Sequence, residues 1–271
     1  MDTHRKTAIV LGAVSGIGKA IGLDLLRRGI RVAATWFDWP ERVDTMRAEF
    51  AATGTAHMIT QVDLTDRRAV DSLVARVTAR FGRLDILINN IERGGWPVVH
   101  GRYTPEQWDL EMATTLKAKQ WSFEAALPHL KASGDGAVIN ISSIAGIVGR
   151  SGPASFLFNE GYAAANRGIS LLTETWARLG APEVRVNELM LGIVETRHGP
   201  QTRGWGLLDE ATRRDIVAHS LLERIGRMDD VVRAVRFLLE DAPFMTGSVI
   251  RLDGGYVLGG ESMAPMPEGV V

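Results

Sequence analysis

The sequence predicts a single doubly wound α/β domain, in which helices cover both faces of a seven-stranded parallel sheet. Two observations predict this fold. Short apolar runs alternate with segments of helical periodicity along the chain, which is the pattern of a parallel sheet. Most of these runs lack a regular alternation of polar and apolar residues, as expected of strands buried on both faces. No linker, repeat or low-complexity segment divides the 271 residues, so we expect one domain over 1–271.

Each element can be placed in order along the chain. The expected strands are Thr7–Leu11, Arg31–Thr35, Ala56–Gln61, Leu84–Asn89, Ala137–Ile141, Arg185–Met190 and Ser248–Leu252. Helical spacing fills the segments between them, roughly 17–28, 41–52, 66–81, 105–131, 161–179, 208–219 and 229–240. The clearest helix start has Thr104 as N-cap, Pro105 at the first helical position and Gln107 three residues after the cap. The last dozen or so residues are expected to form an extended tail.

Composition excludes several classes of function. The net charge of −1 offers no basic field for nucleic acid, and the absence of cysteine excludes disulfides, thiolate metal ligands and cysteine nucleophiles. The six histidines show no helical pairing, so no metal site is expected. No apolar run approaches the roughly 18 residues of a membrane span. We therefore expect a cytoplasmic protein without a nucleic-acid or membrane partner.

A glycine-rich segment joins the first strand to the first helix. It reads Gly12-Ala13-Val14-Ser15-Gly16-Ile17-Gly18. Glycine lets a backbone turn tightly and approach a pyrophosphate, whose charge then meets the free N–H groups of the helix N-terminus. The spacing differs from the longer dinucleotide fingerprint, so a turn of packing value only is the alternative.

Polar residues also end the third and fourth strands. Asp63 stands where a carboxylate could accept from an adenine amino group, although it could instead cap the helix expected at 66–81. Asn89 and Asn90 could face a cofactor or pin the strand ends. Ligands bind at the carboxyl ends of strands in open α/β sheets. The three features together therefore indicate a nucleotide site at this edge.

These residues and their order resemble the short-chain dehydrogenase/reductase family, over roughly Lys6 to Tyr256. The family implies a Rossmann sheet, hydride transfer between NAD(H) or NADP(H) and an alcohol–carbonyl pair, and assembly as a homotetramer or homodimer. The motifs that carry the resemblance are the glycine segment, Asp63-Leu64-Thr65, Asn89-Asn90, Asn140-Ile141-Ser142-Ser143, Tyr162, Arg185-Val186-Asn187, Thr246-Gly247 and Asp253-Gly254-Gly255.

The resemblance also implies the cofactor contacts. It assigns the pyrophosphate to Gly12, Ser15, Gly16, Ile17 and Gly18, the adenine to Asp63 and Leu64, and the adenosine ribose to Asn89. It places Gly192, Ile193 and Thr196 over the nicotinamide, within a substrate loop at about 192–220. At the end of the second strand, Trp36 replaces the acidic residue of NAD-preferring members, which favours NADP; Asp38 favours NAD.

The catalytic group of the family is Ser, Tyr and Lys, with an Asn on the preceding helix. Ser143 and Tyr162 match, whereas Asn166 stands at the Lys position and Thr115 at the Asn position. We expect Ser143 to bind the carbonyl and Tyr162 to donate a proton. Asn166 is expected to hydrogen-bond the ribose. Because neutral tyrosine is an acid, the losses harm alcohol oxidation more than carbonyl reduction.

Several further residues have two readings. Glu92 and His198 fall near the expected nicotinamide and substrate regions; His198 could instead be a solvated loop residue. Three arginines could contact an anionic substrate, or they could be ordinary surface charge. Two tryptophans could contact a flat or apolar ligand, or they could pack in the core. These residues are Arg150, Arg197, Arg203, Trp96 and Trp205.

Three functions remain open from the sequence. The first is an NAD(P)H-dependent reductase of a small-molecule carbonyl. The second is a nucleotide-binding subunit that is catalytically silent and supports a partner. The third is a reductase of a C=C or C=N bond, for which a Lys relay matters less. Binding of cofactor without turnover would select the second, and turnover of alkenes or imines but not ketones the third.

Overall fold

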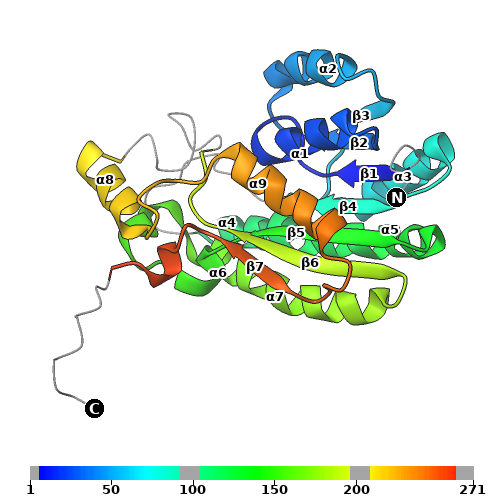
Figure 1. The fold of residues 1–271 in the computed structure, drawn as a ribbon. Coiled ribbons are helices and arrows are strands. Elements are labelled where there is room, and N and C mark those ends of the chain that lie inside the picture. The colour runs from blue at the N-terminus through cyan, green and yellow to red at the C-terminus, as the bar shows by residue number, and fades with distance from the viewer. Residues whose placement is uncertain (1–5, 92–103, 196–207, 261–271) are drawn as a thin grey trace.

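The computed structural model describes residues 6–91, 104–195 and 208–260. Within them, a seven-stranded parallel sheet has the order β3-β2-β1-β4-β5-β6-β7, and helices cover both of its faces (Figure 1). The predicted fold class and all seven expected strands are confirmed. The strands are β1 (Thr7–Val10), β2 (Arg31–Trp36), β3 (His57–Gln61), β4 (Ile86–Asn89), β5 (Gly136–Ser143), β6 (Val184–Leu191) and β7 (Val249–Leu252).

The α-helices follow the expected segments, with one addition. They are α1 (Gly16–Arg27), α2 (Val43–Ala51), α3 (Arg67–Phe81), α4 (Pro105–Glu111), α5 (Ala118–Ser133), α6 (Ala145–Val148), α7 (Glu160–Gly180), α8 (Glu210–His219) and α9 (Met228–Arg236). The short helix α6 lies in a segment expected to be a loop. The shorter helical turns are η2 (Pro40–Arg42), η4 (Pro153–Leu157), η6 (Phe237–Asp241) and η7 (Tyr256–Leu258).

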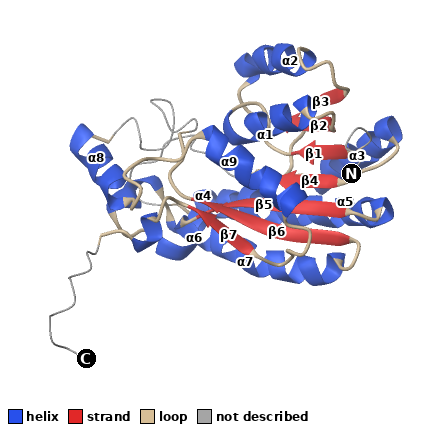
Figure 2. Cartoon of the chain, viewed as in Figure 1, coloured by secondary structure: helices blue, strands red, loops and turns tan. Residues whose placement is uncertain are grey.

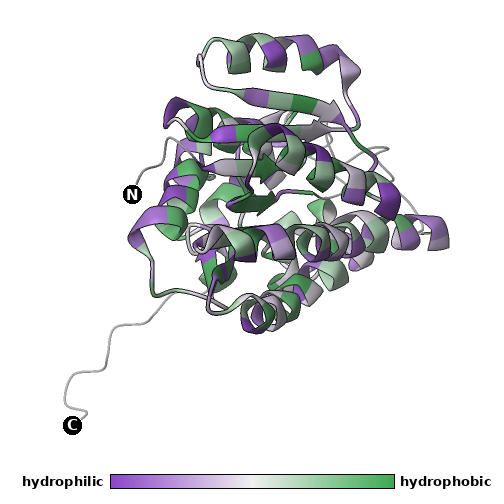
Figure 3. Ribbon diagram, turned by 90° about the vertical axis from the view of Figure 1, so that its right-hand side faces the viewer, coloured by the Kyte–Doolittle hydropathy of each residue, from purple (hydrophilic) through white to green (hydrophobic). Residues whose placement is uncertain are grey.

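Two hydrophobic layers hold the helices to the sheet. Ala8 and Val10 of β1 pack with residues of α1, α2 and α9, whereas Ile9 and Leu11 pack with residues of α3, α5 and α7. Successive strand residues point to opposite faces, so a strand covered on both sides is apolar throughout. This explains why β1, β4 and β5 are buried along their whole length. Figure 2 shows the sheet between the helices, and in Figure 3 hydrophilic and hydrophobic residues alternate along the outer helices.

The expected helix over 105–131 is not one regular α-helix. Its predicted start is confirmed. The Thr104 side chain accepts a hydrogen bond from the Gln107 backbone N–H, and the Gln107 side chain accepts one from the Thr104 N–H. A π-helical turn, η3 (Met112–Lys117), then separates α4 from α5. Thr114 Oγ1 donates to the Leu110 carbonyl at 2.7 Å. Such a bond to the preceding turn competes with the backbone ladder and bends a helix.

The strand order places a ligand site at one end of the sheet. The order reverses between β1 and β4, and in open α/β sheets ligands bind outside the carboxyl ends of the strands at this switch. Within the described part of the chain, the structure contains no helix with the length and apolar character needed to span a membrane.

Candidate active site

The glycine segment packs closely against the end of β4. Gly12 has a φ of +64°, and a Cβ there would lie 2.4 Å from the Asn90 carbonyl oxygen. A Cβ at Gly18 would lie 2.3 Å from the Gly12 carbonyl oxygen. Asn90 Nδ2 donates to that same oxygen at 3.1 Å. Gly12 and Gly18 are therefore required for close packing of backbone against backbone.

Gly16 serves a different purpose from its two neighbours. It has a φ of +59° at the start of α1, and a Cβ there would meet no atom within 4 Å. Packing against the protein therefore does not explain a glycine here. The open space lies at a helix N-terminus, where free N–H groups and the helix dipole attract an anion. This arrangement fits the pyrophosphate of a dinucleotide.

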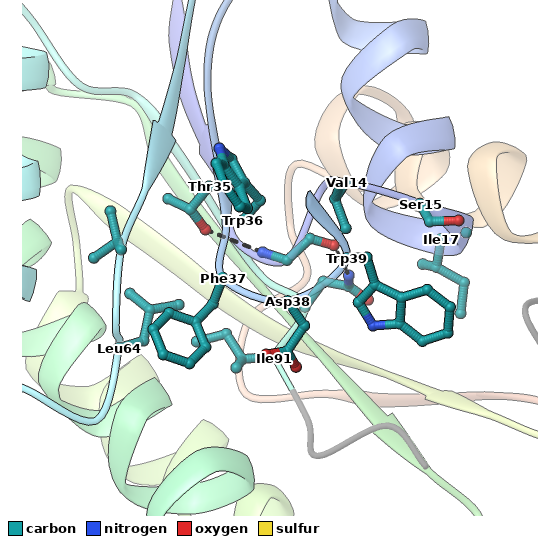
Figure 4. A pocket seen from close by; sticks show the side chains of 14 residues that line it. Val14, Ser15, Ile17, Thr35, Trp36, Phe37, Asp38, Trp39, Leu64 and Ile91 are labelled. Carbon is teal, nitrogen blue, oxygen red and sulfur yellow. Dashed lines mark hydrogen bonds between the residues drawn. The ribbon is translucent and has the colours of Figure 1, made fainter. Parts of the chain in front are cut away.

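A cleft opens beside this loop at the carboxyl ends of β1, β2 and β4. Figure 4 shows Val14, Ser15 and Ile17 near Trp36, Asp38 and Trp39, with Leu64 and Ile91 from the segments that follow β3 and β4. Gly12 N donates to Thr35 Oγ1 at 3.1 Å, which ties the loop to β2. Of the residues expected to contact the cofactor, six line this cleft: Gly12, Ser15, Gly16, Ile17, Trp36 and Leu64.

Other expected cofactor residues lie beside the cleft. Asn89 is fully buried and its Nδ2 donates to Asn140 Oδ1 at 2.9 Å, whereas its neighbour Asn90 lines the cleft. Asp63 Oδ1 accepts from the Thr65 backbone and hydroxyl. The cap of α3 is Asp66, so the alternative role of Asp63 as a helix cap is wrong.

The loop expected over the nicotinamide is described only at its two ends. A Cβ at Gly192 would lie 2.6 Å from the Asp253 Cα, so this glycine allows a close backbone contact. Ile193 packs against the cluster that contains Ile144, Met190 and Tyr256. The remaining candidates of this region lie outside the described residues: Glu92, Trp96, Thr196, Arg197, His198, Arg203 and Trp205.

One basic residue of the nucleotide end is absent from the sequence-based assignment. Arg42 of η2 donates from Nη1 to Ser15 Oγ at 3.0 Å, and its guanidinium lies 4.7 Å from the centre of the Trp39 ring. Trp39 itself has a φ of +67°. Ser15 and Trp39 both line the cleft. The folded chain therefore places a cation beside the end of β2.

Ser143 and Tyr162 lie on elements that pack together. Ser143 ends β5, is 7% exposed, and its Oγ accepts from the Ala145 N–H at 3.1 Å. Tyr162 lies in the first turn of α7, whose cap Asn159 accepts from the Tyr162 N–H at 2.7 Å. The Tyr162 ring stacks on Phe158, with ring centres 6.3 Å apart.

Asn166 connects these two residues. It is fully buried, its Oδ1 accepts from the Ser143 N–H at 3.0 Å, and its Nδ2 donates to the Tyr162 carbonyl at 2.9 Å. The expected hydrogen bond to the ribose is not prepared in this structure, because the amide has no exposed surface and both of its ends bond to backbone. One side chain therefore holds the end of β5 against the first turns of α7.

A second polar group secures the start of α7. Thr115, at the position of the missing Asn, is buried in η3, and its Oγ1 donates to Glu111 Oε2 at 3.4 Å. Asn159 Nδ2 donates to Glu111 Oε1 at 3.1 Å. Glu111 is thus joined to the cap of the helix that carries Tyr162.

Two buried ionisable residues close to β5 were also not anticipated. Lys119 is 1% exposed and its Nζ donates to the Ile141 carbonyl at 2.5 Å. Glu188 is fully buried and accepts from Ser142 Oγ. Burial raises the pKa of the Glu188 carboxyl, and the bonds from Ser142 and Ser170 and the charges of Lys119 and Arg167 only partly oppose this. No local sequence signal marks either residue as part of a site.

Outside this region, the structure gives a contact for one of the two roles expected of Arg150. Arg150 pairs with Glu160 at 2.9 Å on the exposed surface, and this hydrogen bond lowers the pKa of the Glu160 carboxyl. The pairing with Glu160 therefore favours the interpretation of Arg150 as ordinary surface charge. Within the described residues, no group of three or more His, Asp or Glu side chains is arranged to hold a metal.

Known proteins resemble this chain over nearly its whole length. A family model described as enoyl-(acyl carrier protein) reductase matches residues 12–257. A 3-oxoacyl-[acyl-carrier-protein] reductase of Thermotoga maritima is 32% identical, over 95% of this chain and 100% of that protein. A cis-4-hydroxycyclohexanecarboxylate dehydrogenase of Sinomonas cyclohexanicum is 31% identical, over 93% of this chain and 96% of that protein.

A solved structure supports the same conclusion. The short-chain type dehydrogenase/reductase from Mycobacterium ulcerans has a TM-score of 0.79 and 26% sequence identity, covering 94% of this chain and 90% of that one. The chain therefore belongs to the short-chain dehydrogenase/reductase family of oxidoreductases, with a Rossmann fold.

Proposed function

We propose that this protein is an NADP(H)-dependent reductase of a small-molecule carbonyl, in which Tyr162 donates the proton and Ser143 binds the carbonyl oxygen. The observation that carries the proposal is the bridge through Asn166. Its amide joins the backbone of Ser143, at the carboxyl end of β5, to that of Tyr162. The cleft with an open glycine at a helix N-terminus lies at the carboxyl ends of other strands of the same sheet. The backbones that carry the hydroxyl and the phenol are thus held together by one side chain.

The two side chains have the chemistry that reduction requires. Ser143 Oγ already accepts from the Ala145 N–H, which leaves its own O–H to donate to a carbonyl oxygen. A bound nicotinamide supplies hydride to the carbonyl carbon. The neutral Tyr162 phenol then gives its proton to the developing alkoxide and so acts as the general acid.

The preference for NADP rests on Arg42 in this proposal. Its guanidinium lies beside Ser15 and Trp39 at the end of β2, where the adenosine ribose of a dinucleotide binds. A planar guanidinium suits a phosphate with two hydrogen bonds. Trp36 carries no charge that would repel a 2′-phosphate. Asp38 also lines the cleft and is the residue that favours NAD.

Replacing Arg42 tests this preference. We expect Arg42→Ala to lower kcat/KM for NADPH by about 10- to 100-fold, because charge-assisted hydrogen bonds contribute about 1.5–3 kcal/mol, and to leave the value for NADH nearly unchanged. Arg47→Ala is the matched control, since Arg47 is exposed on α2 and pairs only within its helix, with Asp44 at 3.3 Å. An equal loss for both cofactors would contradict a role at the 2′-phosphate.

Reduction of a conjugated C=C bond is the second candidate, because the matching family model is described as an enoyl reductase. The two reactions separate in one assay. A carbonyl reductase turns over 3-oxoacyl thioesters or cyclic ketones. The names of the relatives give a 3-oxoacyl carrier-protein substrate and a cyclic alcohol, which is the reduced partner of a cyclic ketone. A C=C reductase consumes NADPH only with the unsaturated analogue. Binding of NADPH without turnover of either type would support the silent-subunit hypothesis.

We further propose that the protein works in the cytoplasm as a homotetramer or homodimer. Leu171 and Leu179 of α7 are 66% and 54% exposed, which leaves apolar surface on a helix that supports the site. We expect light scattering to give a mass of two or four chains, and Leu171→Asp to reduce it. A monomeric wild-type protein would contradict the proposal.

A further inference from the structure

β5 extends further than its neighbour β4. Asn89, the last residue of β4, pairs with Asn140, whereas β5 continues beside β6 until Ser143. The Ala137 N–H donates to the Asp85 carbonyl of the segment leading into β4. Since strand residues alternate in direction, the N–H and C=O groups of Ile141 and Ser143 also face the β4 side. There they lie beyond the end of that strand.

Two side chains bond to these backbone groups beyond the end of β4. Lys119 Nζ donates to the Ile141 carbonyl at 2.5 Å, and Asn166 Oδ1 accepts from the Ser143 N–H at 3.0 Å. Both groups therefore bond to the same edge of β5, at residues whose Cα atoms are about 7 Å apart along the strand at about 3.3 Å per residue. The ammonium of Lys119 and the amide of Asn166 thus meet one strand edge, although they come from different helices.

The helices that carry them pack against each other. Phe123 of α5 and Trp176 of α7 stack with ring centres 4.7 Å apart and planes at 11°. Asn166 Nδ2 also donates to the Tyr162 carbonyl, so the turn that carries Tyr162 is fixed to the same strand edge. A lysine at position 166 would bring a cation here from α7. The structure brings Lys119 here from α5.

The surrounding charges determine whether this cation is cancelled. Among the described residues, Glu188 on β6 and Arg167 on α7 lie near this strand end, and Glu111 on α4 lies at the cap of α7. Burial raises the pKa of Glu188 and so favours its neutral form. Glu111 accepts hydrogen bonds from Thr115 and Asn159. Arg167 adds positive charge close to Glu188, so the ionisable groups around this strand end are not all of the sign opposite to Lys119.

We propose that Lys119 supplies from α5 the ammonium that α7 lacks at position 166, and that this charge stabilises the phenolate form of Tyr162. Lys119 acts through Tyr162 and is a positioning residue. The inference deepens the proposed function and rests on its assignment of Tyr162. An opposite charge a few ångströms away in a buried site typically lowers the pKa of an acid by one to three units.

The direct test is an ultraviolet titration of Tyr162 in the protein without cofactor. The chain has three tyrosines, so the difference between each protein and its Tyr162→Phe counterpart isolates one phenol. We expect Lys119→Met to raise the pKa of Tyr162 by about one unit or more. Lys117→Met is the matched control, because Lys117 is exposed two residues away and lies over the Trp121 ring at 5.2 Å; it should leave the titration unchanged.

Two further variants keep the test decisive. Lys119→Gln retains a hydrogen-bond donor without the charge, and should raise the pKa of Tyr162 as Lys119→Met does. The double variant Lys119→Met/Asn166→Lys moves the ammonium back to α7, and should restore a lower value. The pH profile of kcat/KM for alcohol oxidation should follow the same order, with its rising limb at higher pH in Lys119→Met.

The outcomes separate this inference from the proposed function. An unchanged Tyr162 titration in folded Lys119→Met or Lys119→Gln overturns it, and so does a loss of stability without any change in that pKa, which would show a structural role only. If the titration shifts as expected but no carbonyl is reduced, the inference on Lys119 holds and the proposed reaction fails.

Discussion

Replacing Tyr162 by Phe is expected to lower the rate of carbonyl reduction by on the order of 10²-fold or more, the usual contribution of a positioned acid. The substitution removes only the phenolic oxygen. The ring stacked on Phe158 remains, as do the backbone bonds of residue 162 to Asn159 and Asn166. We therefore expect an unchanged melting temperature and unchanged NADPH binding, measured together with single-turnover kinetics.

Ser143→Ala provides the comparison for this experiment. It removes a neutral hydrogen bond to the carbonyl, worth about 0.5–1.5 kcal/mol, so its loss should be smaller than that of Tyr162→Phe. Near wild-type turnover of Tyr162→Phe would place the proton donor elsewhere. Glu92 and His198, which lie outside the described residues, would then be the first candidates.

Gly16→Asp is expected to abolish NADPH binding while the fold survives. A Cβ at this position meets no atom within 4 Å, so we expect the new side chain to fit without displacing its neighbours. It does place a carboxylate at the N-terminus of α1, where the pyrophosphate would bind. The carboxylate and the pyrophosphate are both negative and repel each other. We expect calorimetry to show at least about a 100-fold loss of affinity, because two like charges at close range cost several kcal/mol in a low-dielectric site.

The strain of this substitution has its own control. Gly16 has a φ of +59° and Gly54 a φ of +71°, and neither has an atom within 4 Å of a built Cβ. Gly54 lies between α2 and β3, away from the cleft residues. Gly54→Asp should therefore cause similar backbone strain with unchanged NADPH affinity. Retained binding in Gly16→Asp would remove the pyrophosphate assignment.

The fold was predictable because its signals are local. Apolar runs marked every strand, and the Thr104–Gln107 cap was visible as four consecutive residues. The π turn η3 was not predicted, because a helix that widens by one residue keeps nearly the same apolar spacing. The bond from Thr114 to the Leu110 carbonyl is a local cause, but many helical threonines make it without such a turn.

The site was predictable only where a motif carries it. Ser143, Tyr162 and the glycine loop follow from residue order, whereas one partner of Asn166, the Ser143 N–H, comes from β5, 23 residues away. Lys119 stands in a helix two residues after Lys117 and directly before Gln120, and the sequence shows no sign of its contact with Ile141. Arg42 lay inside an expected helix that begins later in the structure. Contacts between elements distant in sequence decide these roles, and periodicity does not encode them.

The most direct test of the proposed reaction uses NADPH carrying deuterium at the reactive nicotinamide carbon. The protein is incubated with 3-oxoacyl thioesters and cyclic ketones, and the products are analysed by mass spectrometry. Carbonyl reduction with Tyr162 as proton donor predicts an alcohol with one deuterium on the carbinol carbon. The wild type should form this alcohol, and Tyr162→Phe should form it far more slowly. Binding of NADPH without deuterium transfer to any carbonyl, or transfer to an alkene carbon only, would contradict it.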